Sequence, residues 1–263
     1  MKIVYLNVCE NFKKMKSIYF LLISILCIGC VKEKSFADDI VLSFPKNTEM
    51  KTQEFNEDGN EFGENLFYIG KIAKNIEVKY YKNFIAPIPI NPSDAINEKL
   101  FPYFRNQNLV QGETYYKDMI QDLNSNNLEI HARIKDTIPL YKRDFNEKGI
   151  KKHYAFPVFI KNISNQILKI PIESKNAALY IYDKELKRFF FVRNSNYMIE
   201  GFGNQKQPYF ELKPNEILVY AYPYFKKGKK QKAKMKFYNA SSKEFEISID
   251  ENIIKNQRNN YYE

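Results

Sequence analysis

Apolar and polar side chains alternate along much of the second half of this chain, and this alternation constrains the fold more than any other feature of the sequence. From Leu128 to Ile134 every second residue is apolar, and short runs of similar character follow at regular spacing as far as Ile249. Successive side chains of a strand point to opposite faces, so a period of two is typical of a strand with one buried face. The second half is therefore predicted to consist of short strands rather than helices.

Turn-forming residues separate these runs, as is usual for antiparallel strands joined by tight connections. The strands that we expect after Ile134 are Tyr154–Ile163, Gln166–Ile172, Ala178–Asp183, Arg188–Arg193, Tyr209–Leu212, Glu216–Phe225, Lys230–Tyr238 and Glu244–Ile249. Many short strands favour an antiparallel β-sandwich over residues 127–252, with other antiparallel folds as the alternative. Their order, with the turns Asn162–Asn165 and Lys213–Asn215, resembles an immunoglobulin-like domain, although this region has no Trp and no cysteine pair.

Residues 40–126 have a mixed pattern. Three runs have the length and β-branched content of strands, namely Ile40–Phe44, Leu66–Ile72 and Ile76–Tyr81. Helices are expected at Ser93–Leu100, after a capping serine, and at Glu113–Leu123, where apolar side chains recur at every third or fourth position. We therefore expect a mainly β protein with a smaller α+β part over residues 40–126 and a flexible tail over residues 253–263.

All cysteines of the chain lie within its first 30 residues, at Cys9, Cys27 and Cys30. The rest of the chain can therefore contain no disulfide bond, no catalytic thiol and no cysteine-bound metal. A chain of this length buries enough of its surface to be stable without such cross-links.

A short apolar segment, Ile18–Ile28, follows three lysines and ends just before Gly29-Cys30. At about 1.5 Å per residue, a helix of this length cannot cross the roughly 30 Å core of a bilayer, but the segment suits the apolar region of a secretory signal. Met15 begins a more typical signal than Met1 does, because it removes an untypically long lead that contains Glu10. A short transmembrane anchor or a buried helix is the alternative interpretation.

The sequence Leu26-Cys27-Ile28-Gly29-Cys30 resembles the lipobox of bacterial lipoproteins. Its relaxed form, with Cys27 where a leucine is usual, is similar to that of spirochaete lipoproteins of the Borrelia type. The resemblance implies that residues 1–29 are a signal peptide, that the Cys30 thiol carries a fatty acyl group such as palmitate, and that residues 30–39 tether a domain to the membrane. It also implies an exported protein that is lipid-anchored to the cell envelope, at the outer membrane, the cell surface or the periplasmic face.

Positive charge is concentrated in the second half of the chain. Residues 151–263 carry 21 basic and 11 acidic side chains, and this excess equals the whole net charge of +10. The densest cluster consists of Lys226, Lys227, Lys229, Lys230, Lys232, Lys234 and Lys236. From Lys230 onward the lysines alternate with uncharged residues, which predicts a strand with ammonium groups along one face.

Two interpretations of this lysine cluster remain open. In the first, the lysines protect an exposed sheet edge from pairing with other chains. In the second, they form a hairpin, turning at Lys227-Gly228 between the strands Glu216–Phe225 and Lys230–Tyr238, that binds a polyanion. The candidate partners are anionic lipid headgroups, lipid-linked sugars, sulfated glycans or an envelope protein, and lysine rather than arginine favours diffuse attraction. Nucleic acid is disfavoured because export is expected.

The sequence contains no recognisable catalytic or metal-binding motif. His131 and His153 lack the spacing of a metal site, and neither a nucleophile elbow nor a phosphate-binding glycine loop occurs. The acidic segment Glu54–Asn65 lacks the glutamate that ends a calcium-binding loop, so a solvated loop is preferred. We therefore expect no metal and no cofactor.

Aromatic clusters at Phe189–Phe191 and Tyr220–Phe225 are expected to fill the core, with an exposed aromatic platform at the second cluster as the alternative. The function that these features favour is a membrane-anchored, non-enzymatic binding or envelope-assembly lipoprotein. The alternative is a cell-envelope hydrolase, because two paired carboxylates can hydrolyse glycosides without a recognisable motif.

Overall fold

The structure is a computed structural model of the whole chain, and it describes residues 34–44, 52–53, 66–78, 80–81, 104–105, 110–144, 149–171, 177–192, 205–223 and 228–250. It divides into two units, Met1–Asp38 and Asp39–Glu263. In the first unit the Ser35 N–H donates to the Asp38 carboxylate over 2.9 Å, and the Asp38 N–H donates to the Ser35 carbonyl. The expected tether over residues 30–39 therefore contains a turn and is not fully extended.

The second unit is mainly β, and its largest sheet has six strands. They follow the order β2-β10-β15-β3, and β8 and β9 also pair with β10. These strands are β2 (Thr52–Gln53), β3 (Leu66–Lys71), β8 (Leu128–Ala132), β9 (Ile138–Asp144), β10 (Gly149–Asn162) and β15 (Glu216–Pro223). All pairs in this sheet are antiparallel except β2 with β10.

Two further antiparallel sheets complete the sandwich. A five-stranded sheet consists of β12 (Ala178–Asp183), β13 (Arg188–Phe191), β16 (Lys229–Phe237), β17 (Ala240–Ser241) and β18 (Phe245–Ile249). A three-stranded sheet consists of β7 (Gly112–Tyr115), β11 (Leu168–Pro171) and β14 (Lys206–Leu212). Two short parallel pairs join β1 (Val41–Ser43) to β4 (Asn75–Glu77), and β5 (Tyr80–Tyr81) to β6 (Phe104–Arg105).

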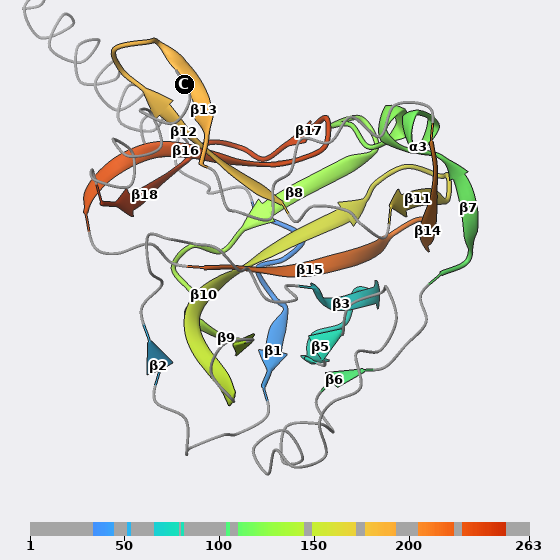
Figure 1. Cartoon of the computed structure of the whole chain (residues 1–263), viewed down its shortest axis with the longest axis horizontal. Coiled ribbons are helices and arrows are strands. Elements are labelled where there is room, and N and C mark those ends of the chain that lie inside the picture. Colours follow the sequence, from blue (N-terminus) through green and yellow to red (C-terminus); the bar gives the residue numbers. More distant parts are fainter. Residues whose placement is uncertain are drawn as a thin grey trace, which may run out of the picture. The chain divides into compact units, whose positions relative to one another are not determined.

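One apolar core joins the three larger sheets, whose strands are labelled in Figure 1. The six-stranded sheet contributes alternate residues of β10 and β15, namely Phe156, Val158, Ile160, Leu218, Tyr220 and Tyr222. The other two sheets contribute Leu168, Ile170, Leu179, Ile181, Phe210, Leu212, Met235 and Phe237. Each such side chain contributes roughly 1.5–3 kcal/mol of stability when it is removed from water. Because the sheets bury these side chains face to face, the fold is a β-sandwich.

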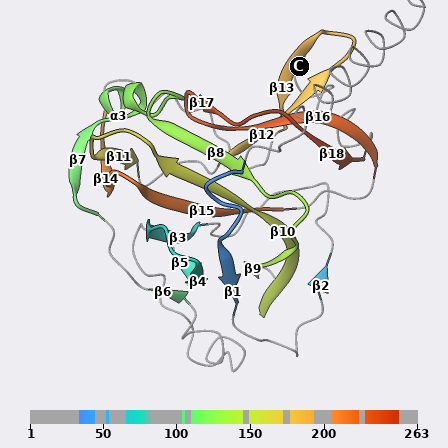
Figure 2. The ribbon, with the colours of Figure 1, turned by 180° about the vertical axis from the view of Figure 1, so that it is seen from behind.

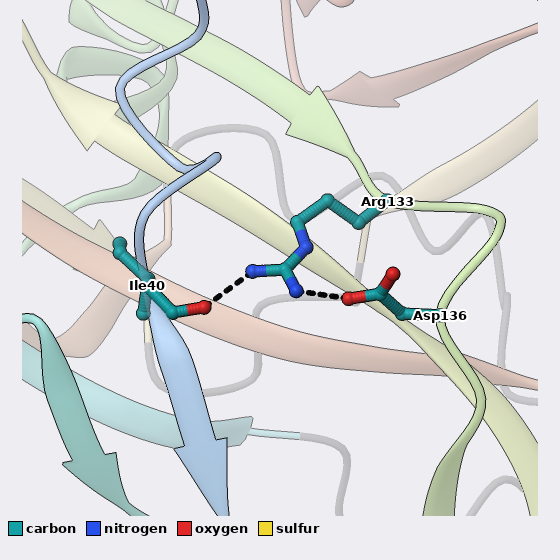
Figure 3. A network of polar contacts seen from close by, with 3 residues as sticks. All are labelled: Ile40, Arg133 and Asp136. Carbon is teal, nitrogen blue, oxygen red and sulfur yellow. Dashed lines mark hydrogen bonds and ion pairs between the residues drawn. The ribbon is translucent and has the colours of Figure 1, made fainter.

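The six-stranded sheet is buried on its second face as well, where β1 lies (Figure 2, in blue). Phe159 and Val219 alternate with the core residues of their strands and are fully buried on this side. Phe44 packs edge to face on Phe67, with ring centroids 5.8 Å apart. Figure 3 shows the Arg133 guanidinium donating to the Ile40 carbonyl and pairing with Asp136. Burial on two faces explains the near-continuous apolar sequence of residues 155–160 in β10 and 217–222 in β15.

The alternation in the sequence predicts most strand positions well, and the prediction of a mainly β antiparallel sandwich is confirmed. The immunoglobulin-like connectivity stays a prediction. The smaller α+β part expected over residues 40–126 is not shown as a part of its own, although the described residues there contain strands and the helix α3 (Tyr116–Asp122). Strands β3 and β7 of this range pair with β15 and β14 of the second half, within the single unit Asp39–Glu263.

The helix expected at Glu113–Leu123 is shorter than predicted. Helix α3 covers Tyr116–Asp122, and the residues before it form β7, which pairs with β14. Tertiary pairing therefore overrides the helical pattern at this end. The helix expected at Ser93–Leu100 and the tail over residues 253–263 lie outside the described residues. No described helix has the length and apolar character needed to span a membrane.

Candidate functional site

Strand β16 separates its side chains onto two chemically different faces. Ala233, Met235 and Phe237 are at most 1% exposed and belong to the core of the sandwich. The residues on the other face of the strand point outward, and we name this set the lysine row: Lys230, Lys232, Lys234 and Lys236. Burial of the apolar face holds the strand in register, because a slip of one residue would move two or three of these ammonium groups into buried positions.

The hairpin expected around Lys227-Gly228 does not form. Strand β15 pairs with β10 and β3, whereas β16 pairs with β12, β17 and β18. The chain therefore crosses from one sheet of the sandwich to the other, because both strands present apolar residues to the same core from opposite sides. Lys226 and Lys227 lie outside the described residues. Lys229, at the start of β16, is exposed and lies on the opposite face of the strand from the lysine row.

The interpretation of the lysines as protection for an exposed sheet edge stays open for part of β16. Strand β12 pairs with one edge of it only through Ala233–Lys236, and β18 pairs with the other edge through Lys229–Ala233. Protection of an edge therefore still accounts for Lys230 and Lys232, which lie where no pairing on the β12 side is described. Lys234 and Lys236 lie where β12 covers that edge, so they need another explanation.

Aromatic rings from β12 and β13 lie beside the lysine row. The Lys234 Nζ atom is 4.2 Å from the ring centroid of Phe189, and the Lys236 Nζ atom is 4.9 Å from that of Tyr180. The Lys232 Nζ atom is 5.9 Å from the ring of Tyr182. A cation over the face of an aromatic ring is attracted by the ring's negative charge density.

These rings form a cluster of their own, which we name the outer aromatic cluster: Tyr180, Tyr182, Phe189 and Phe191. Tyr180 contacts Phe191 with centroids 5.6 Å apart, and Tyr182 contacts Phe189 at 5.3 Å. The cross-strand register places each of these two pairs directly opposite in the antiparallel β12–β13 ladder. The cluster therefore supports the lysine side chains across the sheet and limits their freedom.

Carboxylates lie on the other side of the lysine row. Lys232 forms an ion pair with Glu244, and the Lys230 Nζ atom is 3.8 Å from a carboxylate oxygen of Glu246. The hydrogen bond to Glu244 and the negative charge of that carboxylate raise the pKa of Lys232 above its ordinary value. Lys232 therefore stays protonated, and its charge is partly neutralised within the protein.

The remaining sequence candidates do not join this surface. His131 lies in β8 opposite Phe159 of β10, which is six residues along that strand from the buried His153. At about 3.3 Å per residue the two histidines are roughly 20 Å apart, so they cannot share a metal ion. No group of three or more potential metal ligands occurs in the part of the chain that the structure describes. Cys30 and the acidic segment Glu54–Asn65 lie outside that part.

The tyrosines of β15 fill the core and form no exposed platform. Tyr220 and Tyr222 are at most 3% exposed, and the ring of Tyr222 lies 5.5 Å from that of Phe156. Burial raises the pKa of Tyr222 above its ordinary value, so its hydroxyl stays protonated. Tyr224 lies outside the described residues.

Sequence reasoning found the lysines and missed their neighbours. Phe189 and Phe191 are expected in the core, and the register of β12 with β13 places them beside Tyr182 and Tyr180, on the side opposite to Phe190, which packs on the core cluster. Phe191 is nevertheless buried, as expected, whereas Phe189 is only half-buried. The available signal was the alternation of Ala178–Asp183, which already puts both tyrosines on one face. No local feature of the sequence predicts which strands lie beside β16.

Comparisons with known proteins show no relative of this chain. No protein-family model, no curated protein and no solved structure matches the chain.

Proposed function

We propose that the protein is a membrane-anchored, non-enzymatic binding lipoprotein, which contacts polyanions through the outer face of the five-stranded sheet. The observation that carries the proposal is the lysine row, four ammonium groups along the outer face of β16. Like charges at this spacing repel one another and attract counterions. An anionic partner relieves that repulsion and releases those counterions.

The aromatic contacts support a binding role for this face over a role in solubility alone. Lysines that only keep a protein soluble need no fixed geometry. Here Lys234 and Lys236 lie over ring faces, which reduces the side-chain entropy lost when a ligand binds. A row of ammonium groups held in place is a preorganised surface for a partner of opposite charge.

Binding is tested with heparin as the polyanion, measured by affinity at rising salt. Replacing the four residues of the lysine row by Gln is expected to abolish retention at about 0.15 M salt, where screening acts within roughly 8 Å. The matched control replaces four exposed lysines elsewhere, namely Lys71, Lys74, Lys117 and Lys135. Equal loss in both variants would show that heparin responds to net charge alone, and the proposal would fail.

Anchoring is tested separately by metabolic labelling with a fatty-acid analogue. A Cys30→Ala variant is expected to lose both the label and its membrane fractionation, whereas Cys27→Ala is expected to retain them. The two cysteines lie three residues apart, so the pair controls for loss of any thiol in this segment. Label retained on the Cys30→Ala variant would contradict the anchoring.

A further inference from the structure

We infer that the ligand of this face is a linear acidic polysaccharide, bound along β16 on its aromatic side, with Lys234 and Lys236 as the principal anion contacts. This inference rests on the proposed function. It specifies the class of ligand and the end of the lysine row that binds it. It starts from an asymmetry across the lysine row that the sequence does not reveal.

The two ends of the lysine row have different partners. Lys230 and Lys232 pair with Glu246 and Glu244, so much of their charge is already balanced. No described carboxylate forms an ion pair with Lys234 or Lys236, and both lie over aromatic rings instead. A ring attracts a cation without neutralising its net charge. The uncompensated positive charge of the row is therefore at its Lys234–Lys236 end.

The position of the glutamates disfavours a membrane surface as the partner. Strand β18 is the direct neighbour of β16, and Glu246 lies opposite Lys232 in their register. The backbones of neighbouring strands are about 4.8 Å apart, so Glu246 is next to the lysine row. Both Glu244 and Glu246 are exposed on this face. A planar layer of anionic headgroups laid on the lysines would also cover these carboxylates and be repelled by them. A single chain can lie on the β12 side and avoid them.

The rings disfavour single-stranded nucleic acid, the other common linear polyanion. Proteins bind such strands by stacking bases on aromatic faces. In this protein ammonium groups of the lysine row already lie over the rings of Tyr180 and Phe189. A polysaccharide with sulfate or carboxylate groups needs no such stacking, and lysine suits it because the attraction is diffuse. Lys234 and Lys236, two residues apart on one face, present charges about 6.6 Å apart along the chain direction.

The experiment compares two double variants of equal charge in the full-length protein. Vesicle binding is taken as the excess over vesicles of neutral lipid alone, because the proposed lipid anchor inserts into both. One replaces Lys234 and Lys236 by Gln, and the other replaces Lys230 and Lys232 by Gln. The probes are a heparin oligosaccharide, vesicles containing phosphatidylserine, and an oligothymidylate. At about 0.15 M salt the first variant is expected to lose about tenfold or more in heparin affinity, and the second about threefold or less.

A third variant tests the role of the carboxylates. Replacing Glu244 and Glu246 by Gln removes the repulsion on the β18 side, so heparin affinity is expected to rise about threefold. A Lys234→Arg, Lys236→Arg variant keeps the charge and is expected to bind heparin as the unmodified protein does, which separates charge from damage to the fold. Urea unfolding of each variant checks that the fold is retained.

The outcomes are distinct. Equal loss of heparin affinity in the two Lys→Gln variants would show that Lys234 and Lys236 are not the principal contacts. The proposed function would still stand. Tighter binding to the vesicles or the oligothymidylate than to heparin would overturn the polysaccharide. No measurable binding of the unmodified protein to any probe would overturn the proposed function and this inference together.

Discussion

Asn162 is expected to be the most sensitive polar residue of the sandwich, and Asn162→Ala tests this. Its side chain is fully buried at the end of β10. The amide group donates to the Gln166 carbonyl over 2.8 Å and to the Leu212 carbonyl over 2.9 Å. The amide oxygen accepts the Ser164 N–H over 2.9 Å and the Ser164 hydroxyl over 2.7 Å. One side chain thus closes the turn after β10 and joins it to the end of β14.

The expected loss in the free energy of unfolding depends on which of these hydrogen bonds are buried from water. The bond to the Leu212 carbonyl is buried, and the other three are partly accessible to water. A buried group left unsatisfied costs about 1–3 kcal/mol, and each exchangeable bond contributes about 1 kcal/mol. Asn162→Ala should therefore lower the free energy of unfolding by about 4–6 kcal/mol. For a chain of this size that corresponds to roughly 8–24 °C in Tm.

The assay is urea unfolding followed by far-UV circular dichroism and tyrosine fluorescence, since the chain has 20 tyrosines and no tryptophan. Asn165→Ala is the matched control, because Asn165 is exposed in the same turn. It should change the free energy of unfolding by less than about 0.5 kcal/mol. A loss under about 1 kcal/mol for Asn162→Ala, or equal losses in both variants, would refute the reasoning.

An Asn162→Asp variant adds a pH dependence whose sign is fixed by the geometry. Burial and the two facing carbonyl oxygens raise the pKa of the introduced carboxyl above its unfolded value of about 3.9. A raised folded-state pKa means that the protonated form fits the folded protein better. The stability deficit against the unmodified protein should therefore be small near pH 4 and grow as the pH rises through the folded-state pKa. A deficit that does not depend on pH would contradict this.

Two further substitutions test the packing of β16. A Cβ atom on Gly228 would lie 1.8 Å from the Ile249 carbonyl oxygen, so Gly228→Ala must displace backbone and should cost about 1–3 kcal/mol by urea unfolding. Gly112→Ala, whose nearest contact is the Tyr209 side chain at 3.0 Å, should cost less, and the reverse order would contradict the argument. Met235→Ala empties a fully buried position and should cost about 2–5 kcal/mol, and a cost below about 1 kcal/mol would show that β16 does not contribute to the core.

Strand positions could be predicted because they depend on local alternation. The bounds expected for β12, Ala178–Asp183, agree with the structure, and those for β16 differ by one residue at each end. Strand β9 was missed because Pro139 breaks the pattern. Proline removes a backbone donor, and β9 tolerates it because its described pairing is with β10 alone.

Pairings between strands could not be predicted in the same way. The short connection between β15 and β16 suggests a hairpin, but each strand has an apolar face that must reach the same core. Crossing between sheets satisfies both faces, and no local feature of the residues between them records that choice. The same limit applies to the site. The lysine row is readable from the sequence, whereas the rings and carboxylates beside it come from β12, β13 and β18 and meet it only through non-local pairing.

Protection of individual lysines from acetylation tests the central claim most directly. The full-length protein is treated with an amine-acetylating reagent at about 0.15 M salt, with and without a heparin oligosaccharide, and each lysine is quantified by mass spectrometry. Heparin is predicted to protect Lys234 and Lys236 most, Lys230 and Lys232 less, and Lys74, on the loop between β3 and β4, not at all. Uniform protection of exposed lysines, or strongest protection away from β16, would contradict the account.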